Sequence, residues 1–306
     1  MGALPQLDGR IWMTDGGLET SLVFLHGVDL PDFAAFPMLA EEAGRQELRR
    51  YYEPYLVHAR DAGNGMVLDT PTWRASSDWA DRLGVSADEL ADINRSSVGF
   101  IRQLAEEYGI EAVLNGVVGP RGDGYVVGTA MSAEEAADYH RLQIRALAEG
   151  CADLVTAVTM TYAAEAIGIT RAAAEIGLPV AISFTVETDG RLPSGQELGD
   201  AISAVDAATD PTPAYYMVNC AHPTHFEHVL QSGGNWTGRI RGLRANASRA
   251  SHAELDEAEE LDRGDAVELA AQYRSLQVLV PNLTILGGCC GTDSEHVSAI
   301  TTRAPI

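Results

Sequence analysis

Two adjacent cysteines near the C-terminus are the residues of this chain best suited to chemistry. Cys289 and Cys290 follow a short apolar run and two glycines in the segment Leu283-Thr-Ile-Leu-Gly-Gly-Cys-Cys-Gly-Thr292. Glycine permits a sharp turn and a close approach of other groups, so both thiols could face one point. That arrangement suits a soft metal such as Zn²⁺. A buried apolar pair or a vicinal disulfide would explain the same two residues.

A third cysteine favours the metal interpretation. Cys220 ends another short apolar run, Tyr215-Tyr-Met-Val-Asn-Cys220. Three protein ligands with an open fourth position are typical of catalytic zinc, whereas four are typical of structural zinc. We therefore predict a Zn²⁺ site made by Cys220, Cys289 and Cys290. The fourth cysteine, Cys151, precedes an apolar run instead of following one, and we expect it to fill the core.

Eight short runs predict the strands that position these thiols. The runs span residues 11–17, 65–72, 112–119, 153–160, 179–186, 215–220, 239–245 and 283–288. Most are apolar throughout, as in a parallel sheet buried on both faces. Helical patterns lie between them, with capping boxes at Ser86, Ser132 and Thr292 and glycine stops at Gly109, Gly150 and Gly177.

Alternating strands and helices predict an α/β fold, a (β/α)₈ TIM barrel forming a single domain over residues 1–306. A doubly wound open sheet is the alternative. The first strand is not followed by G-x-G-x-x-G, which weakens the dinucleotide-binding version of that alternative.

Composition excludes several kinds of partner. The 306 residues carry a formal charge of −23, which argues against nucleic acid and anionic membranes. No run approaches the roughly 18 apolar residues that cross a bilayer. The start of the chain has no secretory pattern, and four cysteines make no disulfide framework. We expect a cytoplasmic protein with small-molecule partners and no long C-terminal arm, which leaves room for a homodimer through barrel faces.

In such a barrel the active site forms at the carboxyl ends of the strands. The unusual residues of this chain follow that rule, because they lie where the predicted strands end. They are Asp15-Gly16-Gly17 after the first strand, Thr70 to Arg74 after the second, Asn219-Cys220 after the sixth and Cys289-Cys290 after the eighth. The acidic connection 246–264 is either a lid over this site or a solvated loop.

These residues carry a resemblance. Asp15-Gly16-Gly17, Asn219-Cys220 and Gly287-Gly-Cys-Cys-Gly291 together resemble the zinc-dependent homocysteine S-methyltransferase family, which includes enzymes that use betaine or S-methylmethionine as methyl donor. The resemblance covers essentially the whole chain. It implies a barrel whose Zn²⁺ is held by the three cysteines and takes the acceptor thiol at its open position. The implied reaction, part of methionine biosynthesis, moves a methyl group from a sulfonium or quaternary ammonium donor to a thiol such as homocysteine.

The match is incomplete around the substrate. The resemblance implies that Asp15 helps to hold the amino group of the acceptor and that Thr70 lies near the substrate. The family's glutamate after the fourth strand falls on Val158, which cannot balance an ammonium charge. An aromatic position of the family falls on Arg74, and the segment 244–249 replaces a Pro-Asn-Ser sequence. We therefore hypothesise an acceptor or donor that lacks the ammonium group or carries a carboxylate elsewhere.

Two aromatic residues near strand ends, Trp73 and Tyr162, could contact an onium donor through cation–π interaction, although plain packing explains them too.

Two other functions are alternatives to methyl transfer. A zinc hydrolase is disfavoured, because three thiolates largely offset the charge of the metal and activate water poorly. A non-catalytic thiol-binding or sensor protein would bind thiols without turnover.

Overall fold

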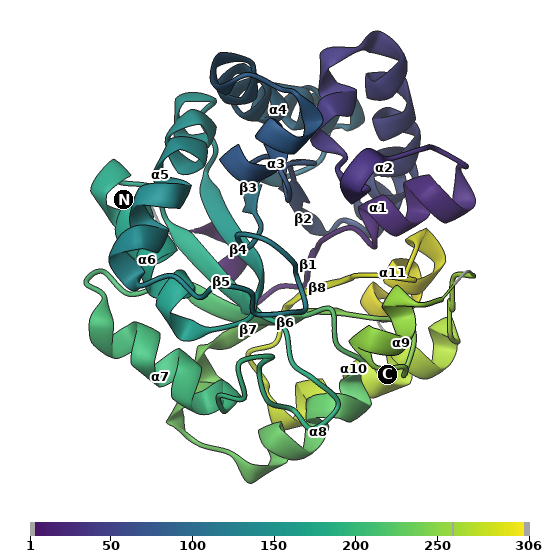
Figure 1. Cartoon of the computed structure of the whole chain (residues 1–306). Helices are drawn as coiled ribbons and strands as arrows, with labels where there is room; N and C mark the ends of the chain where they lie inside the picture. Colours follow the sequence, from purple (N-terminus) through teal and green to yellow (C-terminus); the bar gives the residue numbers. More distant parts are fainter. Residues whose placement is uncertain (1–3, 259, 303–306) are drawn as a thin grey trace.

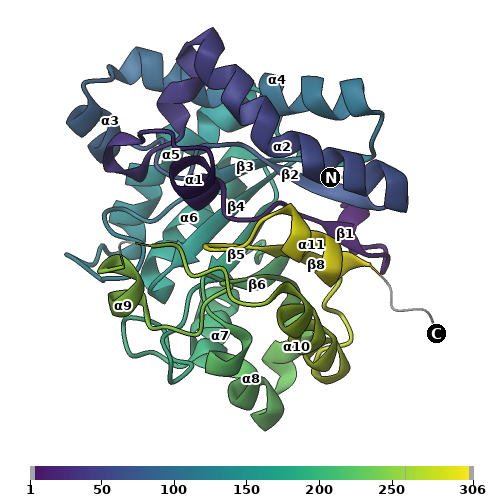
Figure 2. The same cartoon turned by 90° about the vertical axis from the view of Figure 1, so that its right-hand side faces the viewer.

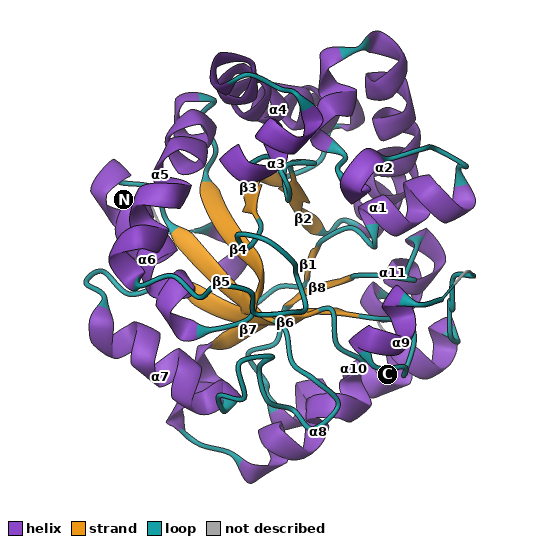
Figure 3. Ribbon diagram, in the orientation of Figure 1, coloured by secondary structure: helices purple, strands orange, loops and turns teal. Residues whose placement is uncertain are grey.

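The strands of the computed structural model close into one parallel barrel in chain order (Figure 3). The structure describes residues 4–258 and 260–302. The strands are β1 (Trp12–Met13), β2 (Gly65–Asp69), β3 (Ala112–Val118), β4 (Leu154–Met160), β5 (Val180–Phe184), β6 (Tyr215–Asn219), β7 (Ile240–Ala245) and β8 (Ile285–Gly288). Because β8 also pairs with β1, the sheet has no edge. The (β/α)₈ prediction is confirmed, and the open-sheet alternative is wrong.

The helices surround this barrel (Figure 1). They are α1 (Leu18–Thr20), α2 (Glu42–Ala62), α3 (Ser77–Leu83), α4 (Ala87–Tyr108), α5 (Ala133–Glu149), α6 (Ala163–Ile176), α7 (Leu198–Ala208), α8 (Pro223–Ser232), α9 (His252–Asp256), α10 (Ala266–Leu279) and α11 (Ser294–Thr301). Figure 2 shows the short helices α1, α3 and α9 at one end of the barrel. Within the described ranges, no helix combines the length and apolar character needed to cross a bilayer.

Local sequence signals set most helix ends. Ser86 and Ser132 each accept a hydrogen bond from a backbone N–H three residues on, completing the predicted capping boxes. Gly109 and Gly177 end α4 and α6 with φ of 64° and 82°, a conformation that favours glycine. Gly150 ends α5 as predicted.

The predicted cap of the last helix is wrong by one residue. Asp293, not Thr292, caps α11 and accepts from the N–H of Glu295 at 3.1 Å. The Thr292 hydroxyl donates instead to the carbonyl of Cys289, 2.7 Å away. Thr292 therefore serves the cysteine turn, and the carboxylate of Asp293 is the acceptor at the helix N-terminus.

The first strand is shorter than the predicted 11–17, because the chain leaves the ladder after Thr14. The N–H of Thr14 donates to Leu286 on β8 at 2.8 Å, and that of Gly17 donates to Thr292 at 3.1 Å. The Asp15-Gly16-Gly17 segment is thus hydrogen-bonded to the turn that carries Cys289. Because the strand ends early, the Asp15-Gly16-Gly17 segment lies beside the Cys289-Cys290 turn, and both were predicted to belong to the site.

The prediction for Cys151 is wrong. Its side chain is exposed in the turn between α5 and β4, where the residue adopts a φ of 64°. The neighbouring Ala152 and Leu154 are buried, whereas Cys151 itself is not. Cys151 lies at the amino end of β4 and takes no part in the site.

The capping box of α5 gives a test of this account. We expect Ser132→Ala to lower the free energy of unfolding by about 1 kcal/mol, because the N–H of Glu135 loses its acceptor. The measurement is the urea unfolding midpoint. Ser203→Ala is the matched control, because that exposed hydroxyl only bonds to Gly199 within α7 and its loss should change stability by less than about 0.5 kcal/mol. Equal effects of both variants would contradict the capping role.

Candidate metal centre and active site

Three cysteine sulfurs converge at the carboxyl end of the barrel. The sulfurs of Cys220, Cys289 and Cys290 all lie within 4.8 Å of one another. Backbone hydrogen bonds fix them, because the N–H of Cys220 donates to Arg244 at 3.0 Å and that of Cys289 donates to Ala245 at 2.9 Å. The ends of β6, β7 and β8 therefore hold the cluster together, as the sequence predicts.

The sulfur cluster has the chemistry of a zinc site. Cys220 and Cys289 are joined by a disulfide in this structure, with Cα atoms 5.4 Å apart, and Cys290 is a free thiol. The vicinal pairing of Cys289 with Cys290 is therefore not formed. Because the thiolate is the metal-binding form, ligation requires Cys220 and Cys289 to be reduced. Three sulfur donors around one point, with no fourth cysteine near them in the described part of the chain, then fit Zn²⁺ with an open position.

The cysteines line a cavity of about 380 Å³. Most of the residues that the sequence singles out share this cavity. They are Asp15, Gly16, Gly17, Thr70, Trp73, Arg74, Val158, Cys220, Cys289 and Cys290. Tyr162 and Asn219 lie outside the lining, so direct substrate contact by these two residues is not supported.

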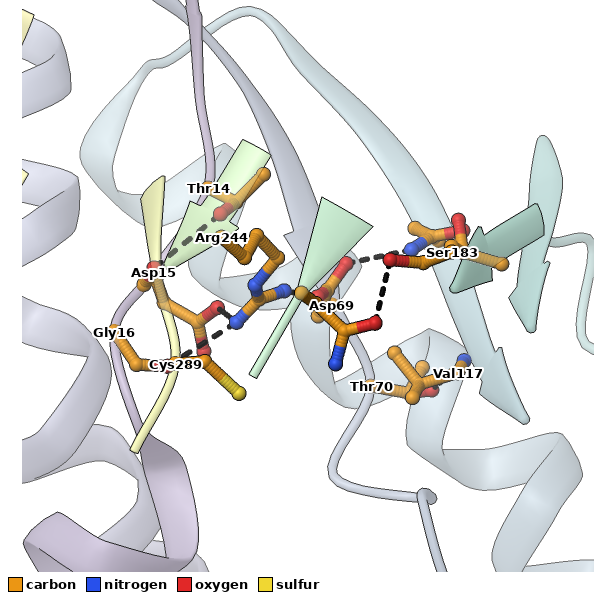
Figure 4. A network of polar contacts seen from close by, with 12 residues as sticks. Thr14, Asp15, Gly16, Asp69, Thr70, Val117, Ser183, Arg244 and Cys289 are labelled. Atoms are coloured by element: carbon orange, nitrogen blue, oxygen red, sulfur yellow. Dashed lines mark hydrogen bonds and ion pairs between the residues drawn. The ribbon is translucent and has the colours of Figure 1, made fainter. Parts of the chain in front are cut away.

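Asn219 is buried and holds the pocket wall from behind. Its side-chain oxygen accepts from the N–H of Thr159 at 2.9 Å, and its amide donates to the hydroxyl of Thr159 at 2.9 Å. Ser183 donates to the same oxygen at 2.6 Å (Figure 4). Thr159 has a φ of 66°, rare for a β-branched residue, in a stretch where the register of β4 shifts. Asn219 thus keeps Thr159 in a strained conformation that aims it into the cavity.

Tyr162 makes a hydrogen bond to the backbone outside the cavity lining, and its onium contact stays a prediction. Its hydroxyl accepts from the N–H of Met131 at 3.0 Å, next to the start of α6. Other aromatic rings line the cavity, namely Phe24, Phe33, Tyr52, Trp73 and Tyr125. The Tyr125 hydroxyl lies 3.5 Å from the sulfur of Cys290, and its ring stacks on His252 with centroids 4.1 Å apart.

A buried guanidinium occupies the floor of the cavity. Arg244, from β7, forms ion pairs with both Asp15 and Asp69 (Figure 4). Two further N–H groups donate to the carbonyls of Gly288 at 3.0 Å and Gly16 at 3.1 Å. Burial alone would lower the pKa of Arg244, but the two carboxylates outweigh burial and raise it. Arg244 is therefore a permanent cation beside the sulfur cluster.

The two carboxylates of this floor have further internal partners. Tyr51 donates to Asp15 at 2.9 Å, and Asn115 donates to Asp69 at 2.6 Å. Burial raises the pKa of Asp69 to about 6, and the charge of Arg244 opposes that rise. The Thr70 hydroxyl, beside them, accepts the N–H of Val117 at 3.0 Å. Every one of these polar groups is engaged by the protein itself.

The second cation of the cavity, Arg74, lies among aromatic rings. Its guanidinium carbon lies 4.0 Å from the ring centroid of Trp79 and 4.9 Å from that of Trp73. One terminal nitrogen donates to the carbonyl of Asp32, and its Nε has no partner among the described residues. Arg74 thus keeps an uncommitted donor in the wall of the cavity.

The acidic connection 246–264 forms part of the cavity wall. It contributes Ser248, Leu255, Asp256, Ala258, Glu260, Leu261 and Asp262 to the lining. His252 in α9 anchors it, because its Nε2 lies 2.6 Å from the carbonyl of Cys220 and its Nδ1 lies 3.1 Å from Glu187. The alternative of a loop that is merely solvated is wrong, and movement of the loop as a lid stays a prediction.

Acidic side chains outnumber basic ones around the cavity. Seven carboxyl residues line it, namely Asp15, Glu19, Asp69, Asp123, Asp256, Glu260 and Asp262, against the two arginines Arg74 and Arg244. Burial and the nearby Asp15 raise the pKa of Glu19 to about 7. Burial and the neighbouring Asp123 also raise the pKa of Asp256. The excess of carboxylates over arginines in this lining favours cations.

The geometry agrees with a comparison with protein families, in which residues 12–304 match the model of homocysteine S-methyltransferase. The chain belongs to the homocysteine S-methyltransferase family. It is 25% identical over 232 residues to the methionine synthase of Mycobacterium tuberculosis. That alignment covers 70% of this chain and 18% of the synthase. The methionine synthase of Mycobacterium leprae is 25% identical over 228 residues, with the same two coverages. This homocysteine S-methyltransferase family member thus corresponds to less than a fifth of each synthase.

Solved structures of the homocysteine methyltransferase MmuM from Escherichia coli share the fold. The oxidised form superposes with a TM-score of 0.74 at 20% identity, covering 94% of both chains. The metallated form gives a TM-score of 0.74 at 20% identity, covering 96% of both chains. The domain limits 1–306 stay a prediction.

Several cavity residues were not singled out from the sequence. Asp69 carries the clearest signal, because it is a charged residue closing the otherwise apolar strand Gly65–Asp69. Glu19 and Tyr125 also line the cavity, from the segments that follow β1 and β3. The pairing of Arg244 with Asp15 has no local signal, since 229 positions separate them.

Gly17 offers a test of how the site is assembled. A Cβ at this position would lie 2.6 Å from the carbonyl oxygen of Cys289, which is backbone and cannot rotate away. We expect Gly17→Ala to lower stability by about 1–3 kcal/mol and to weaken metal retention, because the turn bearing Cys289 must move. Thermal unfolding and zinc retention against a chelator measure the two effects. Gly99→Ala, with open space around its Cβ, is the control; unchanged metal retention in Gly17→Ala would contradict the assembly described above.

Proposed function

We propose that this protein moves a methyl group from a sulfonium or quaternary ammonium donor to a small thiol, homocysteine or a relative, at a Zn²⁺ held by Cys220, Cys289 and Cys290. The observation that carries the proposal is the convergence of these three sulfurs in a cavity at the carboxyl end of the barrel. Membership of the homocysteine S-methyltransferase family supports the same reaction.

Zn²⁺ at the three sulfurs would lower the pKa of an acceptor thiol and keep its sulfur nucleophilic at neutral pH. The protein supplies the surroundings. Burial raises the pKa of the Cys290 thiol. Phe24, Phe33 and Leu255 line the cavity with apolar surface that excludes water from the reacting atoms.

In the proposed transfer, the lone pair of the acceptor sulfur forms the new bond to the methyl carbon. The bond between that carbon and the onium sulfur or nitrogen breaks, and its electron pair stays with the donor. The donor leaves as a neutral sulfide or tertiary amine, so no proton has to move in this step. Catalysis therefore requires alignment and desolvation, and no general acid or base among the lining residues.

The lining also supports a cationic donor. The surplus of carboxylates attracts a positive charge, and aromatic faces such as those of Trp73 and Tyr125 stabilise onium methyl groups. A hydrolase is less well supported, because no carboxylate or histidine joins the sulfur cluster among the described residues. A cytoplasmic location and a homodimer stay predictions.

Metal content tests the proposal first. We expect about one zinc per reduced wild-type chain, by analogy with three-ligand catalytic sites, and its loss in Cys290→Ser. Elemental analysis under reducing, metal-replete conditions measures this. Cys151→Ser is the matched control, since that cysteine is exposed and outside the site. A wild-type chain free of zinc under these conditions would contradict the proposed function. A chain that binds zinc and thiols but shows no turnover would instead indicate a sensor protein.

The pKa of Glu19 predicts how donor binding depends on pH. Glu19 is largely neutral below its pKa of about 7 and anionic above it. We expect the affinity for tetramethylammonium, which does not titrate, to rise on the order of tenfold between pH 6 and 8. Quenching of tryptophan fluorescence, with Trp73 in the wall, reports binding. Glu19→Gln should flatten the rise and Glu134→Gln, on the exposed face of α5, should not; a profile unaffected by Glu19→Gln would remove this residue from donor binding.

A further inference from the structure

We propose that Glu19 selects the acceptor, by binding the ammonium group of an amino-acid thiol while the sulfur of that thiol reaches the three cysteines. The acceptor class is then a thiol that carries an ammonium group beside its carboxylate, as homocysteine does. This inference rests on the proposed function, since it concerns the same site and the same transfer. It adds a residue that determines specificity and no further step.

A substrate ammonium that leaves water needs a carboxylate that the protein has not already used. Homocysteine, for which the family of this chain is named, carries such an ammonium. The floor of the cavity is committed, because each of the four carboxylate oxygens of Asp15 and Asp69 accepts a hydrogen bond. Arg244 supplies one bond to each residue, and Tyr51 and Asn115 supply the others. The floor therefore offers no oxygen that is free of a protein donor.

Two carboxylates of the surrounding loops also bind the protein itself. One oxygen of Asp123 accepts the N–H of Tyr125 at 2.7 Å, and one oxygen of Asp262 accepts the N–H of Gly264 at 3.0 Å. On β4, Val158 gives the wall an apolar side chain that is 9% exposed. Neither these loops nor this strand thus supplies a carboxylate that is wholly free.

Glu19 has no such partner. It lies in α1, lines the cavity and is partly exposed, so a ligand in the cavity can reach it. In the described part of the chain, its carboxylate forms no ion pair and no hydrogen bond with another side chain. Glu19 can therefore supply the charge that Val158 lacks, and the cavity accommodates an acceptor with an ammonium group.

Glu19 is held beside the turn that bears the cysteines. Helix α1 directly follows the Asp15-Gly16-Gly17 segment, and the hydroxyl of Thr20 accepts the N–H of Gly291 at 3.4 Å. Burial is the larger cause of the raised pKa of the Cys290 thiol, and the charge of Glu19 adds to that rise. A short amino-acid thiol at the sulfur cluster would thus have its ammonium beside Glu19.

The nearby guanidinium groups leave Glu19 free. Neither Arg74 nor Arg244 forms an ion pair with it in the described ranges, although the charges of both oppose the rise of its pKa to about 7 that burial causes. An ammonium can pair with Glu19 without displacing a protein group. In the acceptor-free protein the same carboxylate attracts any small cation, which is why tetramethylammonium reports its charge. Once an acceptor ammonium is bound, the onium donor relies on the loop carboxylates and the aromatic rings.

Direct binding of two matched thiols tests this without requiring turnover. The probes are homocysteine and 4-mercaptobutyrate, which is homocysteine without the amino group. The zinc-loaded protein is titrated calorimetrically with each thiol at about pH 8, where Glu19 is mostly anionic. The Co²⁺-substituted protein reports sulfur coordination by a change in its charge-transfer absorption. We expect homocysteine to bind at least about tenfold more tightly than 4-mercaptobutyrate.

The Glu19→Gln variant should bind homocysteine about tenfold more weakly, because the ammonium loses its anionic partner. Its affinity for 4-mercaptobutyrate should stay equal or rise, since that thiol has no ammonium. Gln keeps the shape of the side chain, and zinc content and melting temperature check that the variant is folded. Asp256→Asn is the matched comparison, because it removes a carboxylate from the rim of the same cavity. It should leave the ratio of the two affinities unchanged.

The outcomes separate the two proposals. A wild type that binds 4-mercaptobutyrate as tightly as homocysteine, or a ratio that Glu19→Gln leaves unchanged, would overturn the role of Glu19 and leave the methyltransferase proposal standing. A ratio that falls in Asp256→Asn and not in Glu19→Gln would assign the ammonium to the connection 246–264, which overturns that role as well. Absence of sulfur coordination by both thiols would overturn both proposals.

Discussion

The ion pairs of Arg244 with Asp15 and Asp69 are the interaction on which the site depends. They join side chains of β7 and β2 with the segment that follows β1, and the bond to the carbonyl of Gly288 adds β8. Burying any one of these charges alone would be costly, and together they satisfy one another. The strand ends that carry the cysteines are therefore held at fixed spacing by a charge network under the cavity.

Above this floor, the cavity is bounded by chain that leaves the barrel. The connection after β3 brings Tyr125 over Cys290, and the connection after β7 brings Asp256 and Leu255 to the rim. Rigid strand ends thus position the sulfurs, while loops supply most of the aromatic and acidic surface. This division is typical of barrels, in which loops adapt one framework to different substrates.

The sequence predicts the framework well because its signals are local. Apolar runs locate all eight strands, and the capping boxes at Ser86 and Ser132 mark helix starts. The errors have physical causes. Thr292 and Asp293 are both competent caps, and only the turn at Cys289 decides between them. The link between Arg244 and Asp15 depends on closure of the barrel, which brings distant side chains inward, so no pattern within either segment contains it.

The charge network also constrains how such a protein can change over evolution. Loss of Arg244 alone leaves two buried carboxylates uncompensated, and loss of either aspartate weakens the hold on the guanidinium. An exchange at the floor therefore needs coordinated substitutions, each step passing through a less stable intermediate. Residues at the rim, such as Asp123 and Asp256, face no such barrier. Over evolution, the floor of the cavity should therefore change more slowly than its rim.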